Sequence, residues 1–499
     1  MDQIDRQPVL VGWGQVVARD VPAGQAAEPL ALMERCARDA ASDAGCGSRG
    51  LRELDSLVAV DILGWRYPSA ARLLAERLGA SRALEFDTTL GGNTPQMLIN
   101  DFAGRIRRGE CGSVLIAGAE AIRSRRRAKA AGEELSWTRD ERPAERSGGV
   151  LGDQRPGTNE LEQRHGIFLP PHAFPLFENA LRARLGRGLE EHRRHLGRLY
   201  QRFSRIAAGN PFAWFPKERS AEEIVSATGT NRMIAYPYTK YMNAIMEVDQ
   251  GAAVLMTSAG RARALGISEE RFVHPLGAGE AAEEPWYLSD RPRLDHCPAQ
   301  ALAIGRALAS AGVAAEEINV FDLYSCFPVA VELACEALGI GEDDPRPLTL
   351  TGGLAYGGGP GNNYSLHGIA RVMQHLREQG GLGMVTALGW YMTKHSVGVY
   401  GAEAPARESA PAPVAELIDA VVHAEAPQGK GIVETYTVVH DREGRPERGI
   451  VLGRDAENRR FVANTPTDRE LLEDLERQEA VGLGGRLSSN EGFVAFSPH

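Results

Sequence analysis

A repeated alternation of strand-like and helix-like segments constrains the fold of this chain more than any other feature. In the first half, apolar runs such as Leu57–Leu63 and Ser113–Glu120 are typical of buried strands, and the amphipathic stretch Glu28–Gly45 is typical of a helix. A similar alternation returns in the second half. Helices are expected at Pro298–Ala311, Pro328–Leu338 and Tyr364–Glu378, and strands at Ile318–Leu323 and Leu382–Leu388. Strand–helix alternation indicates a layered α/β domain. Two such halves in one chain predict a duplicated α/β fold.

Two regions differ from this pattern. Residues 121–245 are rich in Arg, Gly and Pro, and their apolar positions follow helical spacing, so they predict a mostly helical insertion. An Ala/Pro-rich linker at 402–413 has no periodicity. Beyond it, short strand-like runs with polar turns predict a small antiparallel β-barrel at 414–499, of OB type. The expected domains are therefore 1–260 with its insertion, 261–401, the linker and the barrel.

Composition restricts the class of protein. Hydrophobic residues make up 43% of the chain and charged residues 24%, as in ordinary globular proteins. The net charge of −10 disfavours nonspecific nucleic-acid binding, which needs a basic surface. The run Arg123–Lys129 is a local exception: it is either a solvated helix end or a patch for the phosphates of a ligand.

The six cysteines are scattered and form no C-x-x-C pair, which argues against a zinc site or a disulfide framework and fits a reducing cytoplasm. We expect no metal. The N-terminal residues have no signal-peptide pattern, and no apolar run reaches membrane-spanning length. The expected location is the cytoplasm.

Four segments resemble one family. Met233–Thr257 (MIAYPYTKYMNAIMEVDQGAAVLMT) is similar to the segment that precedes the second half of sterol-carrier-protein-type thiolases. Thr88–Gln96 (TTLGGNTPQ) stands where thiolases carry the nucleophile loop. Phe321–Gly339 resembles the loop and helix that usually read His-Asp-Cys-Phe, and Gly352–Pro360 resembles the loop that usually ends Gly-His-Pro.

The resemblance covers nearly all of residues 5–400 and implies the duplicated thiolase fold. A thiolase-like core with an added C-terminal β-domain is similar to thiolase-like protein type 1, whose members are commonly labelled acetyl-CoA acetyltransferase. That resemblance implies an acyl-CoA ligand, no permanently bound cofactor, and a monomer or homodimer.

Thiolase chemistry needs a cysteine nucleophile, a histidine that activates it, a second cysteine for proton transfer and an oxyanion hole. Carried over residue by residue, the nucleophile falls on Gly91, the activating histidine on Gly359, the second cysteine on Ala387 and the oxyanion-hole residue on Tyr324. Residues 85–100 contain no cysteine, so a shifted alignment does not restore the nucleophile. We expect that covalent acyl transfer at this position is lost.

Polar residues remain on the same loops. Tyr324, His395, His367 and Cys326 are the catalytic candidates, because tyrosine and histidine transfer protons without a covalent intermediate. For Tyr324, His367 and Cys326 a purely structural role is an equal or better reading, since such residues often pack in a core. The substrate-binding candidates are Asn93, Thr94, Ser325, Gly358, Asn362, Asn363, Tyr391 and Lys394. We expect these loops, including the one that carries Tyr391, Lys394 and His395, to converge on one pocket.

Three functions remain open. The first is an acyl-CoA-binding protein with little or no catalysis. The second is altered chemistry on a CoA thioester, such as retro-aldol cleavage of a β-hydroxyacyl-CoA, which resembles the steroid side-chain aldolases of the superfamily; those act with an OB-fold partner. The third is a structural partner in a lipid- or steroid-metabolising complex.

Overall fold

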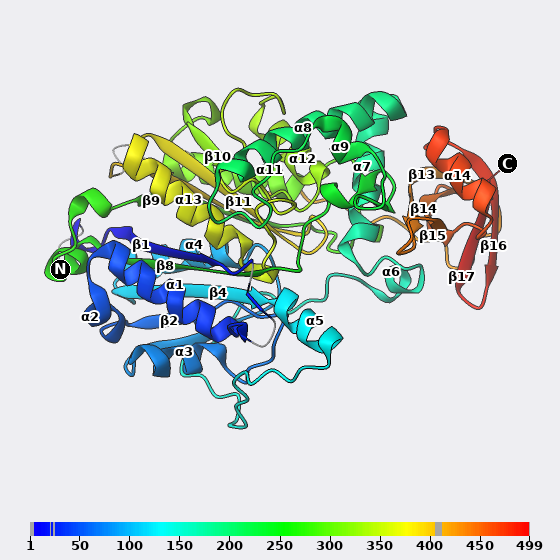
Figure 1. Ribbon diagram of the computed structural model, residues 1–499. Coiled ribbons are helices and arrows are strands. Elements are labelled where there is room, and N and C mark those ends of the chain that lie inside the picture. Colours follow the sequence, from blue (N-terminus) through cyan, green and yellow to red (C-terminus); the bar gives the residue numbers. More distant parts are fainter. Residues whose placement is uncertain (1–3, 20, 23–24, 405–411, 499) are drawn as a thin grey trace.

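The computed structural model describes residues 4–19, 21–22, 25–404 and 412–498. Two β-sheets lie one above the other with helices between and outside them, and the C-terminal strands form a separate body at one end (Figure 1). Most of the linker predicted at 402–413 lies outside the described residues.

The first sheet has the order β1-β8-β4-β2-β3-β5. Strand β8 is antiparallel to both β1 and β4, while β2, β3 and β5 continue from β4 in parallel. Its strands are β1 (Pro8–Val17), β2 (Ser56–Ala59), β3 (Leu84–Thr88), β4 (Ser113–Ala121), β5 (Gly149–Leu151) and β8 (Asp249–Ser258).

The second sheet has the order β10-β11-β12-β9 and repeats the pairing of the first. Strand β9 is antiparallel to β12, β12 is antiparallel to β11, and β11 is parallel to β10, just as β1, β8, β4 and β2 pair above. Its strands are β9 (His274–Ala282), β10 (Val320–Asp322), β11 (Leu382–Gly389) and β12 (Lys394–Gly401). The duplicated fold predicted from the sequence is confirmed.

The helices complete five layers. Helices α4 (Thr94–Arg108) and α13 (Tyr364–Gln379) pack between the sheets and contact both. Helices α1 (Pro29–Ala44) and α3 (Ala70–Leu78) cover the outer face of the first sheet, and α11 (Pro298–Ala311) covers that of the second, beside α12 (Pro328–Leu338). The short helices α2 (Gly47–Arg52) and α10 (Ala259–Ala264) lie at the surface of the first half. Single 3-10 turns are η1 (Ile4–Arg6), η3 (Lys240–Met242), η4 (Glu269–Arg271), η5 (Leu288–Asp290), η6 (Ala315–Glu317) and η7 (Gly361–Asn363).

Paired glycines allow the outer helices to approach the sheets closely. A Cβ atom at Gly12 of β1 would clash with the Ala40 carbonyl of α1, and one at Gly279 of β9 would clash with the Ala303 carbonyl of α11. Because β1 and β9 are equivalent strands, the same close approach occurs in both halves.

The insertion between β4 and β8 is mostly helical. Its elements are α5 (Ile122–Ala131), α6 (Glu160–Arg164), α7 (Pro170–Arg184), α8 (Leu189–Gly209), α9 (Ala221–Val225) and the hairpin β6 (Met233–Ala235) with β7 (Tyr238–Thr239). Its strand β5 pairs with β3 and covers the edge of the first sheet.

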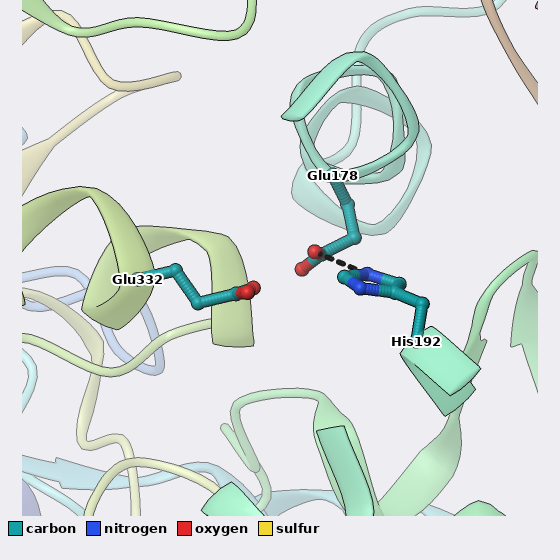
Figure 2. Close-up of side chains that lie close together, drawn as sticks. All are labelled: Glu178, His192 and Glu332. Carbon is teal, nitrogen blue, oxygen red and sulfur yellow. Dashed lines mark hydrogen bonds and ion pairs between the residues drawn. The ribbon is translucent and has the colours of Figure 1, made fainter. Parts of the chain in front are cut away.

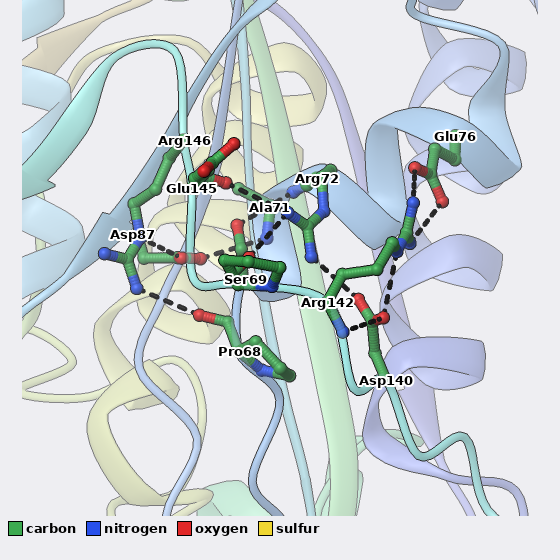
Figure 3. Close-up of polar contacts among 11 residues, drawn as sticks. Pro68, Ser69, Ala71, Arg72, Glu76, Asp87, Asp140, Arg142, Glu145 and Arg146 are labelled. Atoms are coloured by element: carbon green, nitrogen blue, oxygen red, sulfur yellow. Dashed lines mark hydrogen bonds and ion pairs between the residues drawn. The ribbon is translucent and has the colours of Figure 1, made fainter.

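Ion pairs hold the segment before β5 against α3 and β3. Arg72 of α3 pairs with Asp140 at 2.8 Å, Arg146 pairs with Asp87 of β3 at 2.5 Å, and Arg142 bonds both Asp140 and Glu76 (Figure 3). The arginines that anchor this segment therefore come from both sides of the contact.

The C-terminal body is a closed barrel of five strands in the order β14-β15-β17-β16-β13, with β13 also paired to β14. Its elements are β13 (Gly429–His440), β14 (Pro446–Asp455), β15 (Arg460–Asn464), α14 (Arg469–Arg477), β16 (Gly484–Asn490) and β17 (Phe493–Pro498). The barrel was predicted as antiparallel, but β15 and β17 meet in parallel at Asn464 and Ala495. The reason is that α14 connects β15 to β16, and that β17, which runs antiparallel to β16, is the strand that lies next to β15.

Some boundaries differ from the sequence predictions. The strand predicted at Leu57–Leu63 ends at Ala59. Strand β9 was not predicted, because HPLGAGEAA contains small residues instead of the β-branched residues typical of strands. In the described residues no helix is long and apolar enough to cross a membrane.

Candidate functional site

The nucleophile loop of the resemblance lies at the start of α4, beneath the turns of the second half. The Gly91 amide donates to Asn362 Oδ1 at 2.9 Å, and Asn362 Nδ2 donates to the Asp61 carbonyl at 3.1 Å. Ser365 Oγ donates to the Gly92 carbonyl at 3.0 Å. Loops from both halves therefore meet at this point. We call Gly91, Gly92, Asn93, Tyr324, Asn362 and Lys394 the Gly91 cluster.

Lys394 occupies the space that a side chain at Gly91 would need. A Cβ atom at Gly91 would lie 2.8 Å from Lys394 Nζ and 2.6 Å from Asn93 Oδ1. The ammonium donates to the Leu90 carbonyl at 3.0 Å, and only 6% of Lys394 is exposed. Burial lowers the pKa of this amine. The Lys394 nitrogen thus fills the space beside Gly91, the position at which the resemblance to thiolases would place the nucleophile.

Tyr324 closes the other side of the loop. Its amide donates to Thr386 Oγ1 at 2.8 Å, its ring meets Tyr364 edge-on at 5.5 Å between centroids, and its hydroxyl lies against the Gly92 backbone. Burial raises the pKa of the phenol well above its usual range, so Tyr324 is a neutral hydrogen-bonding group.

A cavity of about 280 Å³ opens beside Lys394. Two of its lining residues, Asn93 and Glu280, are joined through Ser396: Asn93 Nδ2 donates to Ser396 Oγ at 3.3 Å, and Ser396 Oγ donates to Glu280 Oε2 at 2.6 Å. Asn93 Oδ1 has no hydrogen-bond donor among the described residues. The cavity is lined by Thr89, Asn93, Thr94, Met97, Gly152, Asp153, Glu280, Ala281, Ala282, Lys394 and His395. Sequence reasoning missed Glu280 and Ser396, because Glu280 belongs to the unpredicted strand β9.

His395 lies in the strand β12, as does Lys394, and not on the loop where the sequence placed them. The reason is that β11 and β12 are joined by a tight turn at Trp390–Met392, with positive φ at both of these residues. His395 Nε2 contacts Cys297 Sγ at 3.2 Å, and burial lowers the pKa of His395 to about 3. Burial also raises the pKa of the Cys297 thiol well above its usual range, so both groups are neutral.

The structure does not bring His367 or Tyr391 into the Gly91 cluster. His367 Nδ1 pairs with Gln15 Oε1 of β1 at 3.1 Å, and burial lowers its pKa to about 3. Tyr391 points to the insertion, where its hydroxyl donates to the Phe168 carbonyl at 2.9 Å. The expected convergence of all the loops on one pocket therefore does not hold for these two residues.

The remaining candidates hold the loops to one another. Ser325 Oγ accepts from the Leu354 amide at 3.3 Å, and Asn363 Nδ2 donates to the Gly118 carbonyl at 2.7 Å. At Gly358 φ is 106°, and a Cβ atom there would clash with Gln250. Burial raises the pKa of the Cys326 thiol, which disfavours a thiolate.

The other two positions at which the resemblance implies lost groups, Gly359 and Ala387, lie apart from one another. The Gly359 amide donates to the Ile245 carbonyl at 2.8 Å, next to the insertion. Ala387 lies in β11, opposite Ser396 of β12. Neither glycine nor alanine has a side chain that can act as an acid or a base.

A larger cavity of about 790 Å³ lies at the ends of β2 and β3, and its lining includes Asp61, Arg66, Arg125 and Arg146. The run Arg123–Lys129 is on α5, where Arg126 pairs with Glu247 and Arg125 donates to the Gly64 carbonyl at 2.9 Å. Thr88 lines the larger cavity and Thr89 the smaller one, so this chain segment separates them. A role of Arg123–Lys129 in binding phosphates stays a prediction.

Comparison with known proteins agrees with this geometry. Solved thiolases share the fold: human mitochondrial 3-ketoacyl-CoA thiolase in complex with CoA has a TM-score of 0.57 at 15% identity, over 80% of this chain and 99% of its own. The Ltp2–ChsH2(DUF35) aldolase has a TM-score of 0.61 at 17% identity, over 81% of this chain and 100% of its own. The chain is thus a protein of the thiolase fold.

A nearer relative defines the family. A monomeric SCP2-thiolase-like protein type 1 from Mycobacterium smegmatis is 33% identical, with a TM-score of 0.83, and the match covers 99% of each chain. Residues 413–492 match the model of the thiolase-like protein type 1 additional C-terminal domain. The chain therefore belongs to the SCP2-thiolase-like protein type 1 family. No curated protein matches it.

Proposed function

We propose that this protein binds acyl-CoA thioesters without forming a covalent acyl-enzyme. The observation that supports this most directly is the position of Lys394 Nζ in the space beside Gly91, 2.8 Å from where a Cβ atom would stand. Glycine offers no nucleophile, and the buried thiols of Cys297 and Cys326 have raised pKa values that disfavour thiolates. The fold family supports CoA as the ligand, since the human thiolase was solved with CoA.

In this proposal the acyl thioester end enters the 280 Å³ cavity. Lys394 Nζ donates to the thioester carbonyl, a charge-assisted hydrogen bond that is stronger than a neutral one. Asn93, the residue before α4, faces the same cavity, but its unused oxygen is an acceptor and cannot bond a thioester carbonyl. The site therefore holds the thioester through the hydrogen bond from Lys394, and its function is recognition.

Replacing Lys394 with methionine tests this assignment. We expect the affinity for acetyl-CoA, measured by isothermal titration calorimetry, to fall at least about tenfold, because a hydrogen bond from a charged donor contributes about 1.5–3 kcal/mol. The affinity for free CoA, which lacks the carbonyl, should change less. Lys430→Met, at an exposed position of the barrel, is the matched control and should bind as the unaltered protein does. Equal acetyl-CoA binding by Lys394→Met and the control would refute the assignment.

Retro-aldol cleavage of a β-hydroxyacyl-CoA is the second candidate function. What favours it is that the Tyr324 hydroxyl lies against Gly92 and the Lys394 amine lies against the neighbouring Gly91. In this reaction the Lys394 amine, whose pKa burial lowers, takes the β-hydroxyl proton in its neutral form, and the Tyr324 phenol donates a proton to the enolate that forms as the C–C bond breaks. No nucleophilic cysteine is needed. His395, bonded to Cys297, is not required for it. In a complex with lipid-metabolising enzymes, the third function, the same site would serve binding alone.

The barrel is proposed to be of OB type. Strand β15 is parallel to β17, and helix α14 lies between β15 and β16 in the chain. This arrangement supports a five-stranded Greek-key barrel. The division into 1–260, 261–401 and 414–499 accords with the two sheets and the barrel, and stands as a proposal.

The oligomeric state proposed for this chain is a monomer. Strand β5 pairs with β3 at the edge of the first sheet, so β3 offers no free hydrogen-bonding groups to a second copy. The family relative from M. smegmatis is described as monomeric.

A further inference from the structure

Three helices bring a histidine and two glutamates together in the core, away from the Gly91 cluster. Glu178 comes from α7, His192 from α8 and Glu332 from α12, and their side chains point at one another (Figure 2). His192 Nε2 lies 2.7 Å from Glu178 Oε1, and one ligand atom from each of the three lies within 4.8 Å of the other two. At most 3% of each residue is exposed.

A second set of groups shares Glu332 and leads to the surface. His195 Nε2 lies 3.1 Å from Glu332 Oε1 and 3.7 Å from Glu342 Oε1. His195 and Glu342 line a cavity of about 460 Å³. His192 and His195 are one helical turn apart on α8. His195 and Glu342 therefore connect this cavity with the buried group of Glu178, His192 and Glu332, and an ion could enter there.

Two buried carboxyls face each other in this group. Arg187 lies on its outer side, 2.8 Å from Glu332 Oε1 and 3.5 Å from Glu342 Oε1. Because burial makes uncompensated charge costly, Glu178 and Glu332 need either a bound proton or a bound cation between them. A dication bound by both carboxylates and His192 meets that need.

Unused polar atoms point to the same conclusion. Within the described residues, Glu332 Oε2 and His192 Nδ1 are buried and have no hydrogen-bond partner. Imidazole is the commonest side-chain ligand of metal ions in proteins. Tyr238 donates to Glu178 Oε2 at 2.5 Å and orients that carboxylate, as outer groups do at metal sites.

We propose that Glu178, His192 and Glu332 bind one divalent first-row transition-metal ion. Imidazole and carboxylate ligands suit Zn²⁺ and Mn²⁺. The ion joins two helices of the insertion to a helix of the second half, so its role is structural. This site is independent of the proposed acyl-CoA binding. The site could not be predicted from the sequence, because the three ligands form no local motif and the scattered cysteines argue against zinc.

The first test is metal content and its effect on stability. The protein is expressed in medium that contains both Zn²⁺ and Mn²⁺, purified without chelator and analysed by inductively coupled plasma mass spectrometry. We expect one equivalent of one of these metals per chain. After removal of the metal by a chelator, adding back Zn²⁺ or Mn²⁺ should raise the midpoint of thermal unfolding, because the ion binds the folded state. A stripped protein that takes up neither ion, with no change in that midpoint, overturns the proposal.

Variants then locate the ion. Glu332→Gln and His192→Asn each remove one ligand and retain much of the side-chain shape. We expect each to weaken metal binding at least about 100-fold, since even outer-shell changes weaken it 10–100-fold. His375→Asn, on α13, is the control and should bind as the unaltered protein does. Stoichiometric binding that neither ligand variant weakens places the ion elsewhere and overturns the assignment. If a variant does not fold, the titration of the unaltered protein decides the result.

Discussion

Gly279→Ala should lower the free energy of unfolding by about 2–3 kcal/mol, because added atoms in a tightly packed contact force the backbone apart. The new Cβ atom would clash with the carbonyl oxygen of Ala303, which belongs to the rigid backbone of α11. Urea denaturation followed by circular dichroism measures the change. Gly12→Ala, at the equivalent contact between β1 and α1, should have an effect of similar size. There the new Cβ atom would clash with the carbonyl oxygen of Ala40, which also belongs to a helix backbone.

Gly188→Ala is the control for these two variants. Gly188 precedes α8, and a Cβ atom there would meet no other atom within 4 Å. Its stability should stay within about 0.5 kcal/mol of the unaltered protein, as for most surface substitutions. Equal stability of Gly279→Ala and Gly188→Ala would mean that the helix does not approach the sheet as closely as the structure shows.

Arg460→Met should lower the free energy of unfolding by about 3 kcal/mol, the scale seen when one partner of a buried ion pair is removed. The guanidinium is 2% exposed, pairs with Glu434 at 2.7 Å and donates to the carbonyls of Ser289 and Pro292, each at 3.2 Å. These carbonyls belong to the second half, so Arg460 ties the barrel to the core. Removing it leaves them without a donor.

Arg454→Met is a matched control, since Arg454 pairs with the other oxygen of Glu434 at 2.9 Å but is 21% exposed. Exposed ion pairs contribute about 0–1 kcal/mol, so this variant should differ little from the unaltered protein. Both variants are measured by the same urea titration. If Arg454→Met were the more destabilising of the two, the attachment of the barrel through Arg460 would be wrong.

Sequence patterns predicted most of the two halves. Helices α11 and α12 begin and end where the sequence placed them, since each starts at a proline and ends before a glycine. Strand β9 was missed because its small residues serve the close approach of α11 and hide the strand pattern. The polar run of β16 (GGRLSSN) was missed for lack of apolar alternation, since it is stabilised by pairing with β13 and β17.

The site could be predicted only where the resemblance fixed the loops. Gly91, Tyr324 and Asn362 lie together as that resemblance implies, and Lys394 joins them. The partners of His367 and His395 could not be predicted, because Gln15 and Cys297 come from distant segments that no spacing connects to them. The same holds for Glu332, which meets His192 only after α12 has packed on the insertion.

We propose that the chain holds acyl-CoA without a covalent step, since Lys394 fills the space beside Gly91. Intact-protein mass spectrometry after incubation with acetoacetyl-CoA and CoA tests this proposal. We expect an unchanged protein mass and no acetyl-CoA formed in the same mixture. An acyl adduct on any cysteine of the chain, or thiolysis that consumes acetoacetyl-CoA, would contradict it.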